Sequence, residues 1–156
     1  MRHSRPEFDT QNSLSKINPS KLKVALLVAK WNIDYNQEMA DSAQETLIEH
    51  GFDKDSVHFI YAPGAFEIPY LSQSLFEKGH YDAIICFGTI IRGETYHFEI
   101  VANESARGIM NVMLKNSKPI INGILTVNNE EQAQVRASKS QDDKGKEFAL
   151  SLIQVL

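Results

Sequence analysis

The sequence predicts an α/β protein with a single domain, built as a three-layer α/β/α sandwich around a four-stranded parallel sheet. Short apolar runs alternate with amphipathic segments from Leu22 onwards. Strands joined through helices pair in parallel, because each crossover returns the chain to the same end of the sheet. The chain has 156 residues, a usual length for one domain. Its 42% hydrophobic and 23% charged residues are typical of a globular protein.

Four segments have the length and the aliphatic content of buried strands. The first of them, LKVALLVA, consists almost entirely of leucine, valine and alanine. The predicted strands are residues 22–29, 56–62, 81–91 and 119–127.

Amphipathic helices are predicted between and after these strands. In residues 36–51, Met39, Ala43 and Leu47 follow one another at a spacing of four, and Gly51 is a typical helix stop. The other predicted helices are residues 67–79, about 98–114, and the C-terminal 130–156 with a break near the sequence SQDDKG.

The first 20 residues differ from the rest of the chain. They are polar, contain two prolines and show no sustained hydrophobic period. We therefore expect residues 1–20 to be a tail that is flexible or packed on a neighbouring subunit, and residues 21–156 to form the domain.

The net charge and the cysteine content indicate which binding partners and which cellular compartment to expect. A net charge of -4 argues against a nucleic-acid partner. No apolar stretch reaches the roughly 18 residues of a membrane span, and the N-terminus lacks the order of charged and apolar residues of a signal peptide. Cys86 is the single cysteine and lies in an apolar run, which favours a buried thiol and a reducing compartment. We expect a cytoplasmic protein without nucleic-acid or membrane partners.

In parallel α/β sheets, ligands bind beyond the carboxyl ends of the strands. After the first strand, Trp31 offers a flat face for an aromatic ligand, or covers the core, and Asn32 has hydrogen-bonding groups for the edge of a ring. After the second strand, the sequence PGAFEIP places Glu67 in the first turn of a helix, where it binds a ligand or only complements the helix dipole.

The third junction, GTIIRGETYH (residues 88–97), has the register of a phosphate-binding P-loop except that Glu94 replaces the lysine. Gly93 permits a tight turn, and a helix beginning at Glu94 and Thr95 would offer backbone N–H groups to a single phosphate. His97 is then either a proton-transfer group or a structural residue. Glu94 and His97 also match half of a di-iron motif, but no second copy exists, so no metal is expected.

The fourth junction brings hydrogen-bond donors from Gln132, Arg136 and Lys144 into residues 125–145. A solvated charged face is the simplest interpretation of such a stretch. The planar fork of Arg136 is also suited to phosphate, and Lys144 offers a second cation.

Taken in order, the sequences AKWN, PGAFEIP, GTIIRGETYHFEIV, NGILT and EEQAQVRA followed by KG resemble the 6,7-dimethyl-8-ribityllumazine synthase family, from about residue 22 to the C-terminus. The resemblance implies a transferase of riboflavin biosynthesis. Such an enzyme condenses 5-amino-6-(D-ribitylamino)uracil with 3,4-dihydroxy-2-butanone 4-phosphate, without a cofactor, to 6,7-dimethyl-8-ribityllumazine, phosphate and water.

The resemblance also implies roles for individual residues. Trp31 would stack on the pyrimidine and Asn32 would contact its edge. His97 would transfer protons, Arg136 would be the main phosphate cation, and Lys144 would add a polar contact. The remaining expected site residues are Ala65 and Glu67 beside the ribityl chain, Ile90 and Ile91 beside the ring, and Gly93, Glu94 and Thr95 around the phosphate.

In the family the site lies between adjacent subunits of a pentamer, so Asn122 and Arg136 would come from the neighbouring subunit. The sequence does not decide between single pentamers, paired pentamers and an icosahedral shell. Trp31 and Asn122 both stand where most members have phenylalanine. The larger face of Trp31 predicts riboflavin binding.

Two other functions remain as alternatives. A paralogue that binds or stores riboflavin, with low synthase activity, is favoured by Trp31 and Asn122 but opposed by the retained His97, Arg136 and Lys144. A flavodoxin-like electron carrier or receiver domain would share the predicted flavodoxin-like fold. It is disfavoured, because neither an FMN phosphate loop nor paired aspartates follow the first strand.

Overall fold

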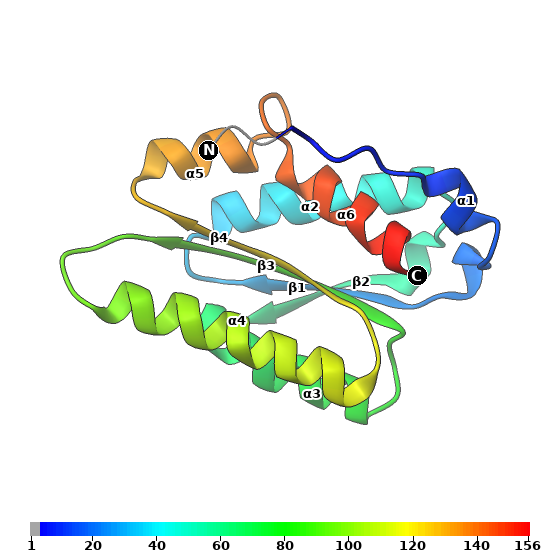
Figure 1. The fold of residues 1–156 in the computed structure, drawn as a ribbon, viewed down its shortest axis with the longest axis horizontal. Coiled ribbons are helices and arrows are strands. Elements are labelled where there is room, and N and C mark those ends of the chain that lie inside the picture. Colours follow the sequence, from blue (N-terminus) through cyan, green and yellow to red (C-terminus); the bar gives the residue numbers. More distant parts are fainter. Residues whose placement is uncertain (1–3) are drawn as a thin grey trace.

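A computed structural model of the chain describes residues 4–156 and has the predicted architecture. All strand pairs are parallel, and the sheet order is β2-β1-β3-β4. The chain thus runs from the central β1 to the edge strand β2, and returns through β3 to the other edge (Figure 1). The strands are β1 Val24–Ala29, β2 Val57–Ala62, β3 Ala83–Ile91 and β4 Ile120–Val127.

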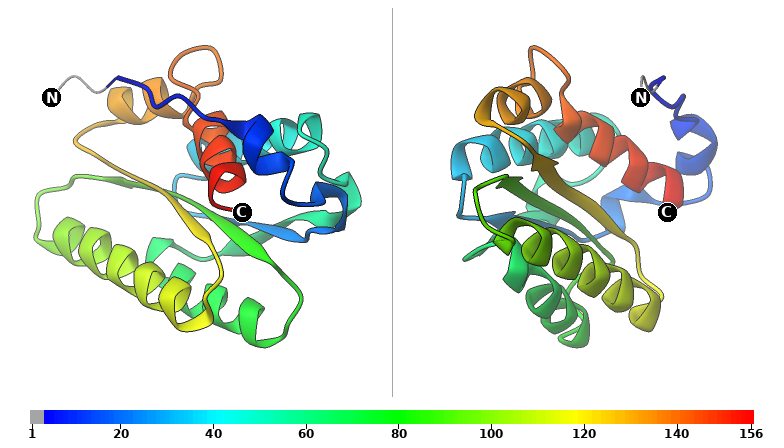
Figure 2. Two further views of the ribbon diagram at one scale, coloured as in Figure 1. Left: turned by 45° about the vertical axis from the view of Figure 1, so that its right-hand side comes forward. Right: turned by 60° about the vertical axis from the view of Figure 1, so that its left-hand side comes forward.

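Helices cover both faces of the sheet and make the predicted three layers. α3 and α4 cover one face, and α1, α2, α5 and α6 lie on the other (Figures 1 and 2). The α-helices are α1 Thr10–Leu14, α2 Ile33–Glu49, α3 Ile68–Glu77, α4 His97–Asn116, α5 Glu130–Ala137 and α6 Lys144–Val155. Short 3-10 helices are η1 Pro19–Lys21, η2 Lys54–Ser56 and η3 Ala65–Glu67. No helix within residues 4–156 is both long and apolar enough to cross a membrane.

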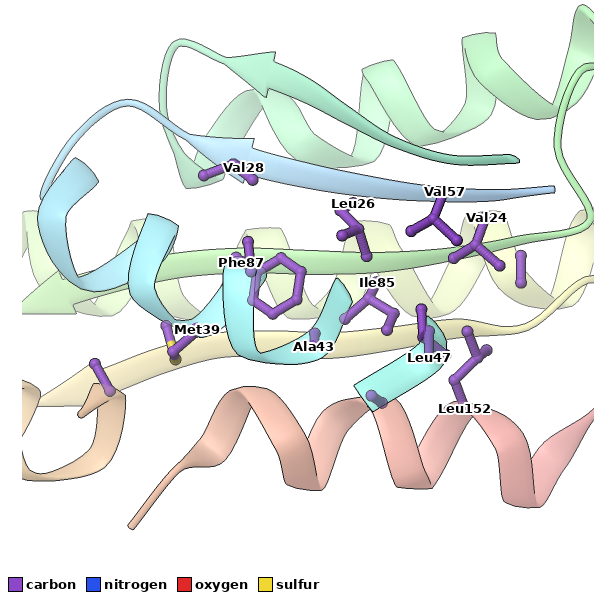
Figure 3. Packing of buried hydrophobic residues seen from close by; sticks show 14 of the residues in the cluster. Val24, Leu26, Val28, Met39, Ala43, Leu47, Val57, Ile85, Phe87 and Leu152 are labelled. Atoms are coloured by element: carbon purple, nitrogen blue, oxygen red, sulfur yellow. The ribbon is translucent and has the colours of Figure 1, made fainter. Parts of the chain in front are cut away.

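Two cores form because β1 is apolar on both faces, as expected of a central parallel strand. Leu26 points into the core shared with α2 and α6, and Leu27 points into the core shared with α3 and α4. Figure 3 shows Leu26 of β1, Met39 of α2 and Leu152 of α6 in the first of these cores. Because β1 is buried on both faces, the positions of its ends are fixed by packing.

Close packing of α6 on α2 requires a glycine. A Cβ on Gly145 would lie 2.1 Å from the backbone oxygen of Met39. Asp143, just before α6, has a left-handed backbone with φ 47° and caps the helix by accepting a hydrogen bond from the Lys146 N–H at 3.2 Å. The predicted break in the C-terminal helical region is therefore present, as the connection 138–143 between α5 and α6.

One predicted helix start needs correction, and the expected N-terminal tail contains a short helix. α2 begins at Ile33 instead of residue 36, because Asn32 adopts a left-handed backbone (φ 59°) that turns the chain directly from β1 into the helix. The expected N-terminal tail contains α1, whose N-terminus is capped by the Asp9 carboxylate. The Asp9 N–H also donates to Gln154 Oε1 at 2.9 Å, so this part lies on α6 of its own chain. Residues 1–3 of that tail lie outside the described residues.

Candidate active site

A cavity of 510 Å³ opens at the carboxyl ends of β1 and β3, between η3 and the first turn of α4. This is the edge of the sheet at which the topology predicts a ligand. Seven predicted site residues contribute to its wall: Trp31, Asn32, Ala65, Glu67, Ile90, Ile91 and His97. They belong to three strand-to-helix junctions, so one cavity explains three clusters that are separate in the sequence.

Trp31 presents an aromatic face at the mouth of this cavity. Its side chain is 77% exposed, which excludes a core position. A Cβ on Gly64 would lie 3.1 Å from Trp31 Cδ1 and 3.2 Å from Glu67 Oε2. The absence of a side chain at Gly64 therefore lets the indole and the Glu67 carboxylate converge from two sides of one wall.

Asn32 is partly committed to the protein. One N–H of its side chain donates to the backbone oxygen of Thr89 at 2.7 Å, across to the end of β3. A primary amide has a second N–H and a carbonyl oxygen. These two groups make no hydrogen bond within residues 4–156 and can serve a ligand.

The turn between β3 and α4 corrects one prediction about the phosphate site. α4 begins at His97, so Glu94 and Thr95 precede the helix instead of opening it. The cause is Arg92, whose N–H donates to the Val127 oxygen at 2.8 Å and keeps the chain beside β4 past the end of β3. Gly93, Glu94 and Thr95 are exposed in this turn and do not line the cavity, although Ile91 and His97 on either side of them do.

Arg92 holds this turn through its side chain as well. The guanidinium forms an ion pair with Glu99, lies 4.1 Å from the centre of the Phe98 ring, and donates to Asn128 Oδ1 at 3.3 Å. The hydrogen bond from Arg92 lowers the pKa of the Glu99 carboxyl. Arg92 thus compensates the negative charge in the first turn of α4, where the free helix N–H groups face the turn.

Three predicted residues lie away from the cavity of their own chain. Asn122 is exposed on the edge strand β4 and accepts a hydrogen bond from the Ile124 N–H at 3.2 Å. Arg136 donates only to the Gln132 backbone oxygen, at 3.1 Å, and forms no ion pair within residues 4–156. Lys144 bonds both carboxylate oxygens of Glu147 at 2.9 Å.

Other cavity residues were not predicted from the sequence. Phe66, 53% exposed, lies inside the motif PGAFEIP. Its position between the predicted site residues Ala65 and Glu67 could have indicated that it lines the cavity. Ile100 and Val101 follow His97 by three and four residues, a spacing that places them on the same helix face. The other unpredicted residues are Ala29, Gly64 and Thr89.

Groups of three or more His, Cys, Asp or Glu side chains with the spacing of a metal site do not occur within residues 4–156. The polar groups of the cavity wall include the indole N–H of Trp31, the amide of Asn32, the carboxylate of Glu67 and the imidazole of His97.

A doubly wound sheet, a cavity at its carboxyl edge and an imidazole in the cavity wall together define an α/β enzyme that acts on small molecules. Residues 21–156 match the 6,7-dimethyl-8-ribityllumazine synthase family. A 6,7-dimethyl-8-ribityllumazine synthase of Pediococcus pentosaceus is 38% identical over 143 residues, which cover 92% of each chain. The chain belongs to this family.

Proposed function

We propose that the chain condenses 5-amino-6-(D-ribitylamino)uracil with 3,4-dihydroxy-2-butanone 4-phosphate to 6,7-dimethyl-8-ribityllumazine, phosphate and water. Family membership over residues 21–156 supports this reaction. The single observation that carries it is the cavity, in which an exposed indole, a carboxylate and an imidazole surround one space of 510 Å³. A cavity of this size suits one ring system with a polar side chain.

The pyrimidine substrate is proposed to bind against Trp31. The indole face stacks on the ring, and the free amide groups of Asn32 bind the ring edge. Ile90 and Ile91 provide an apolar border, since both lie in the cavity wall at the end of β3. Glu67, in the wall beside Ala65, accepts hydrogen bonds from the ribityl hydroxyls.

His97 is proposed to move the protons of the reaction. The substrate amine forms an imine with the ketone of the second substrate and releases water, and phosphate is then eliminated. The ring closes when the ribitylamino nitrogen adds to the carbonyl that elimination generates and a second water is lost. Each step transfers a proton to or from a substrate atom. His97 lies in the first turn of α4 and in the cavity wall, so it is close to both substrates. Orientation by the surrounding wall provides the rest of the rate enhancement.

The phosphate is proposed to bind at the turn formed by Gly93, Glu94 and Thr95, just outside the described cavity. Its cation is Arg136, with Lys144 as a further contact, and both come from a neighbouring copy of the chain together with Asn122. Support for this assignment is that Arg136 lacks a carboxylate partner within residues 4–156 and does not line the cavity of its own chain. An anion site without the fork of Arg136 would depend on backbone N–H groups and on Lys144.

A homopentamer with shared sites agrees with the distribution of exposed groups. Apolar side chains are exposed on α3 and α4, among them Tyr70, Met110 and Leu114 at 76%, 50% and 68%. Arg136 lies on α5, on the opposite face of the sheet (Figures 1 and 2). Two different contact surfaces on one subunit are what a ring requires, because the interface between its neighbours is heterologous. Light scattering of the purified protein tests the ring size.

Incubation of the purified protein with both substrates tests the reaction. We expect the fluorescence of the lumazine product to appear together with one inorganic phosphate for each lumazine. Omission of either substrate is the control. Riboflavin binding without formation of lumazine would instead identify a flavin-binding paralogue.

Riboflavin binding is proposed as a second property of the same cavity. The observation that favours it is the 77% exposure of Trp31, which leaves one face of the indole open to a flat ring. Trp31 is the only tryptophan of the chain, so its fluorescence reports directly on the site. We expect riboflavin to quench it at micromolar concentration, and unchanged emission would remove the proposal.

A cytoplasmic location without a nucleic-acid partner completes the proposal. The only cysteine, Cys86, is fully buried and free, as suits a reducing compartment. The net charge of -4 gives no basis for phosphate-backbone binding. Fractionation of cells that express the protein tests the location.

A further inference from the structure

Asn36 is a polar side chain completely buried in the first turn of α2. An amide is stable in such a position only when its hydrogen bonds are made within the protein. Its Nδ2 group donates to the backbone oxygen of Ala29 and to that of Trp31, each at 2.8 Å. Its Oδ1 accepts from the hydroxyl of Thr89 at 2.7 Å.

We propose that Asn36 is a positioning residue for the ring-binding wall of the cavity, which holds the backbone of Trp31 and Asn32 in place. The inference rests on the function proposed above. It assigns the orientation of the wall to a residue that does not itself line the cavity.

The exposure of Trp31 explains why its backbone needs a separate support. A buried tryptophan is oriented by the side chains packed around it. Trp31 is 77% exposed, so packing restricts it little, and its direction depends on the position of its Cα. The two hydrogen bonds from Asn36 fix the backbone around this Cα. One goes to Ala29, the last residue of β1, and the other goes to Trp31 itself.

Thr89 connects this support to the neighbouring strand. Its hydroxyl donates to Asn36, and its backbone oxygen accepts from the Asn32 side chain at 2.7 Å. Asn32 also has the left-handed backbone, φ 59°, that asparagine tolerates better than most residues. The ends of β1 and β3 are thereby tied together through three polar side chains.

Only an amide of this size makes all three bonds of Asn36. An aspartate would direct a carboxylate at two backbone oxygens 2.8 Å away, and a leucine would leave these oxygens and the Thr89 hydroxyl unpaired. Such changes also destabilise the fold, since each unsatisfied buried group costs about 1–3 kcal/mol. Thr89→Val is milder, because it removes only the hydroxyl and keeps the branched shape.

The test compares Asn36→Ala and Thr89→Val with wild type and with Thr89→Ser, which retains the hydroxyl. Time-resolved anisotropy and acrylamide quenching of Trp31 are measured first, without substrates. We expect faster indole motion in Asn36→Ala and Thr89→Val, and wild-type behaviour in Thr89→Ser. The KM for the pyrimidine substrate is expected to rise about tenfold in the two disrupted variants, as loss of one well-placed hydrogen bond implies, with the KM for the phosphate substrate unchanged.

The outcomes separate this inference from the proposed function. Unchanged motion of Trp31 in a folded Thr89→Val would overturn the positioning role, whatever the activity. An equal rise of both KM values with a lowered melting temperature would also overturn it, because that is the result of a general loss of structure. If wild type forms no lumazine, the function fails, and the fluorescence measurements still decide the role of Asn36.

Discussion

The region around the cavity and the region that carries the cations differ in how complete they are within one chain. Around the cavity, residues of η3, α4 and the ends of β1 and β3 meet without a partner. Arg136 and Lys144, by contrast, lie on α5 and α6, and each hydrogen-bonds to a residue of its own helix. The first region follows from strand order alone, and we propose that the second acquires a ligand only when subunits assemble. The difference implies that ring binding and phosphate binding are separable by mutation.

The largest effect is expected in the cavity, from His97→Gln. Loss of the proton-transfer group should lower kcat by about 10²–10⁴-fold, with little change in either KM. The matched control is His50→Gln. His50 follows the C-terminal end of α2 and does not line the cavity, and its imidazole bonds only the Thr46 backbone oxygen, at 2.7 Å. A kcat within threefold of wild type would contradict the role of His97.

In the cation region, Arg136→Ala should raise the KM for the phosphate substrate about 10–100-fold, because a charge-assisted bidentate contact is lost. The KM for the pyrimidine and riboflavin quenching of Trp31 should stay at wild-type values. Lys54→Ala, on η2 before β2, removes a cation at the opposite end of the sheet and serves as the control. Equal rises of both KM values would show that the two regions are not separable.

A smaller effect is expected from the packing of α2 against α6, the helix that carries Lys144. Gly145→Ala places a Cβ 2.1 Å from the Met39 backbone oxygen, so α6 must move. We expect a loss of about 2 kcal/mol in the free energy of unfolding, and a weaker affinity for the phosphate substrate. Exposed Lys146→Ala is the adjacent control, and equal melting temperatures for the two variants would contradict the close packing.

The smallest effect is expected at Cys86, which belongs to neither region. Burial raises the pKa of its thiol from 9.0 to about 12, against a weak opposing hydrogen bond with Ser72. The native thiol should stay unreactive toward Ellman's reagent at pH 8 until the protein unfolds. The unfolded thiol ionises first as pH rises, so the stability contributed by this group falls between about pH 9 and 12. Cys86→Ala should lack this part of the pH dependence.

The same contrast explains what the sequence could predict. Hydrophobic periodicity was sufficient for the four parallel strands, and the rule about their carboxyl ends located Trp31, Glu67 and His97 in one cavity. Asn36 and Thr89 escaped prediction because they are 53 residues apart and their pairing depends on the folded sheet.

The start of α2 and the turn before α4 were predicted less well, for a local reason in each case. α2 begins early because of the left-handed backbone of Asn32, and Glu94 and Thr95 stay outside α4 because Arg92 bonds to Val127 of β4. Neither feature can be recognised from the spacing of hydrophobic residues in the sequence. The position of Arg136 relative to a bound phosphate depends on a second chain, so the sequence of one chain can indicate it only through family resemblance.

Complementation between subunits tests most directly whether each site is shared. Chains carrying His97→Gln and chains carrying Arg136→Ala are co-expressed in equal amounts, and the mixed oligomers are assayed with both substrates. Random assembly in a ring gives about a quarter of the sites an intact His97 from one chain and an intact Arg136 from its neighbour. We predict that lumazine formation returns to about that fraction of wild type. Mixed oligomers no more active than the better single variant would contradict the shared site.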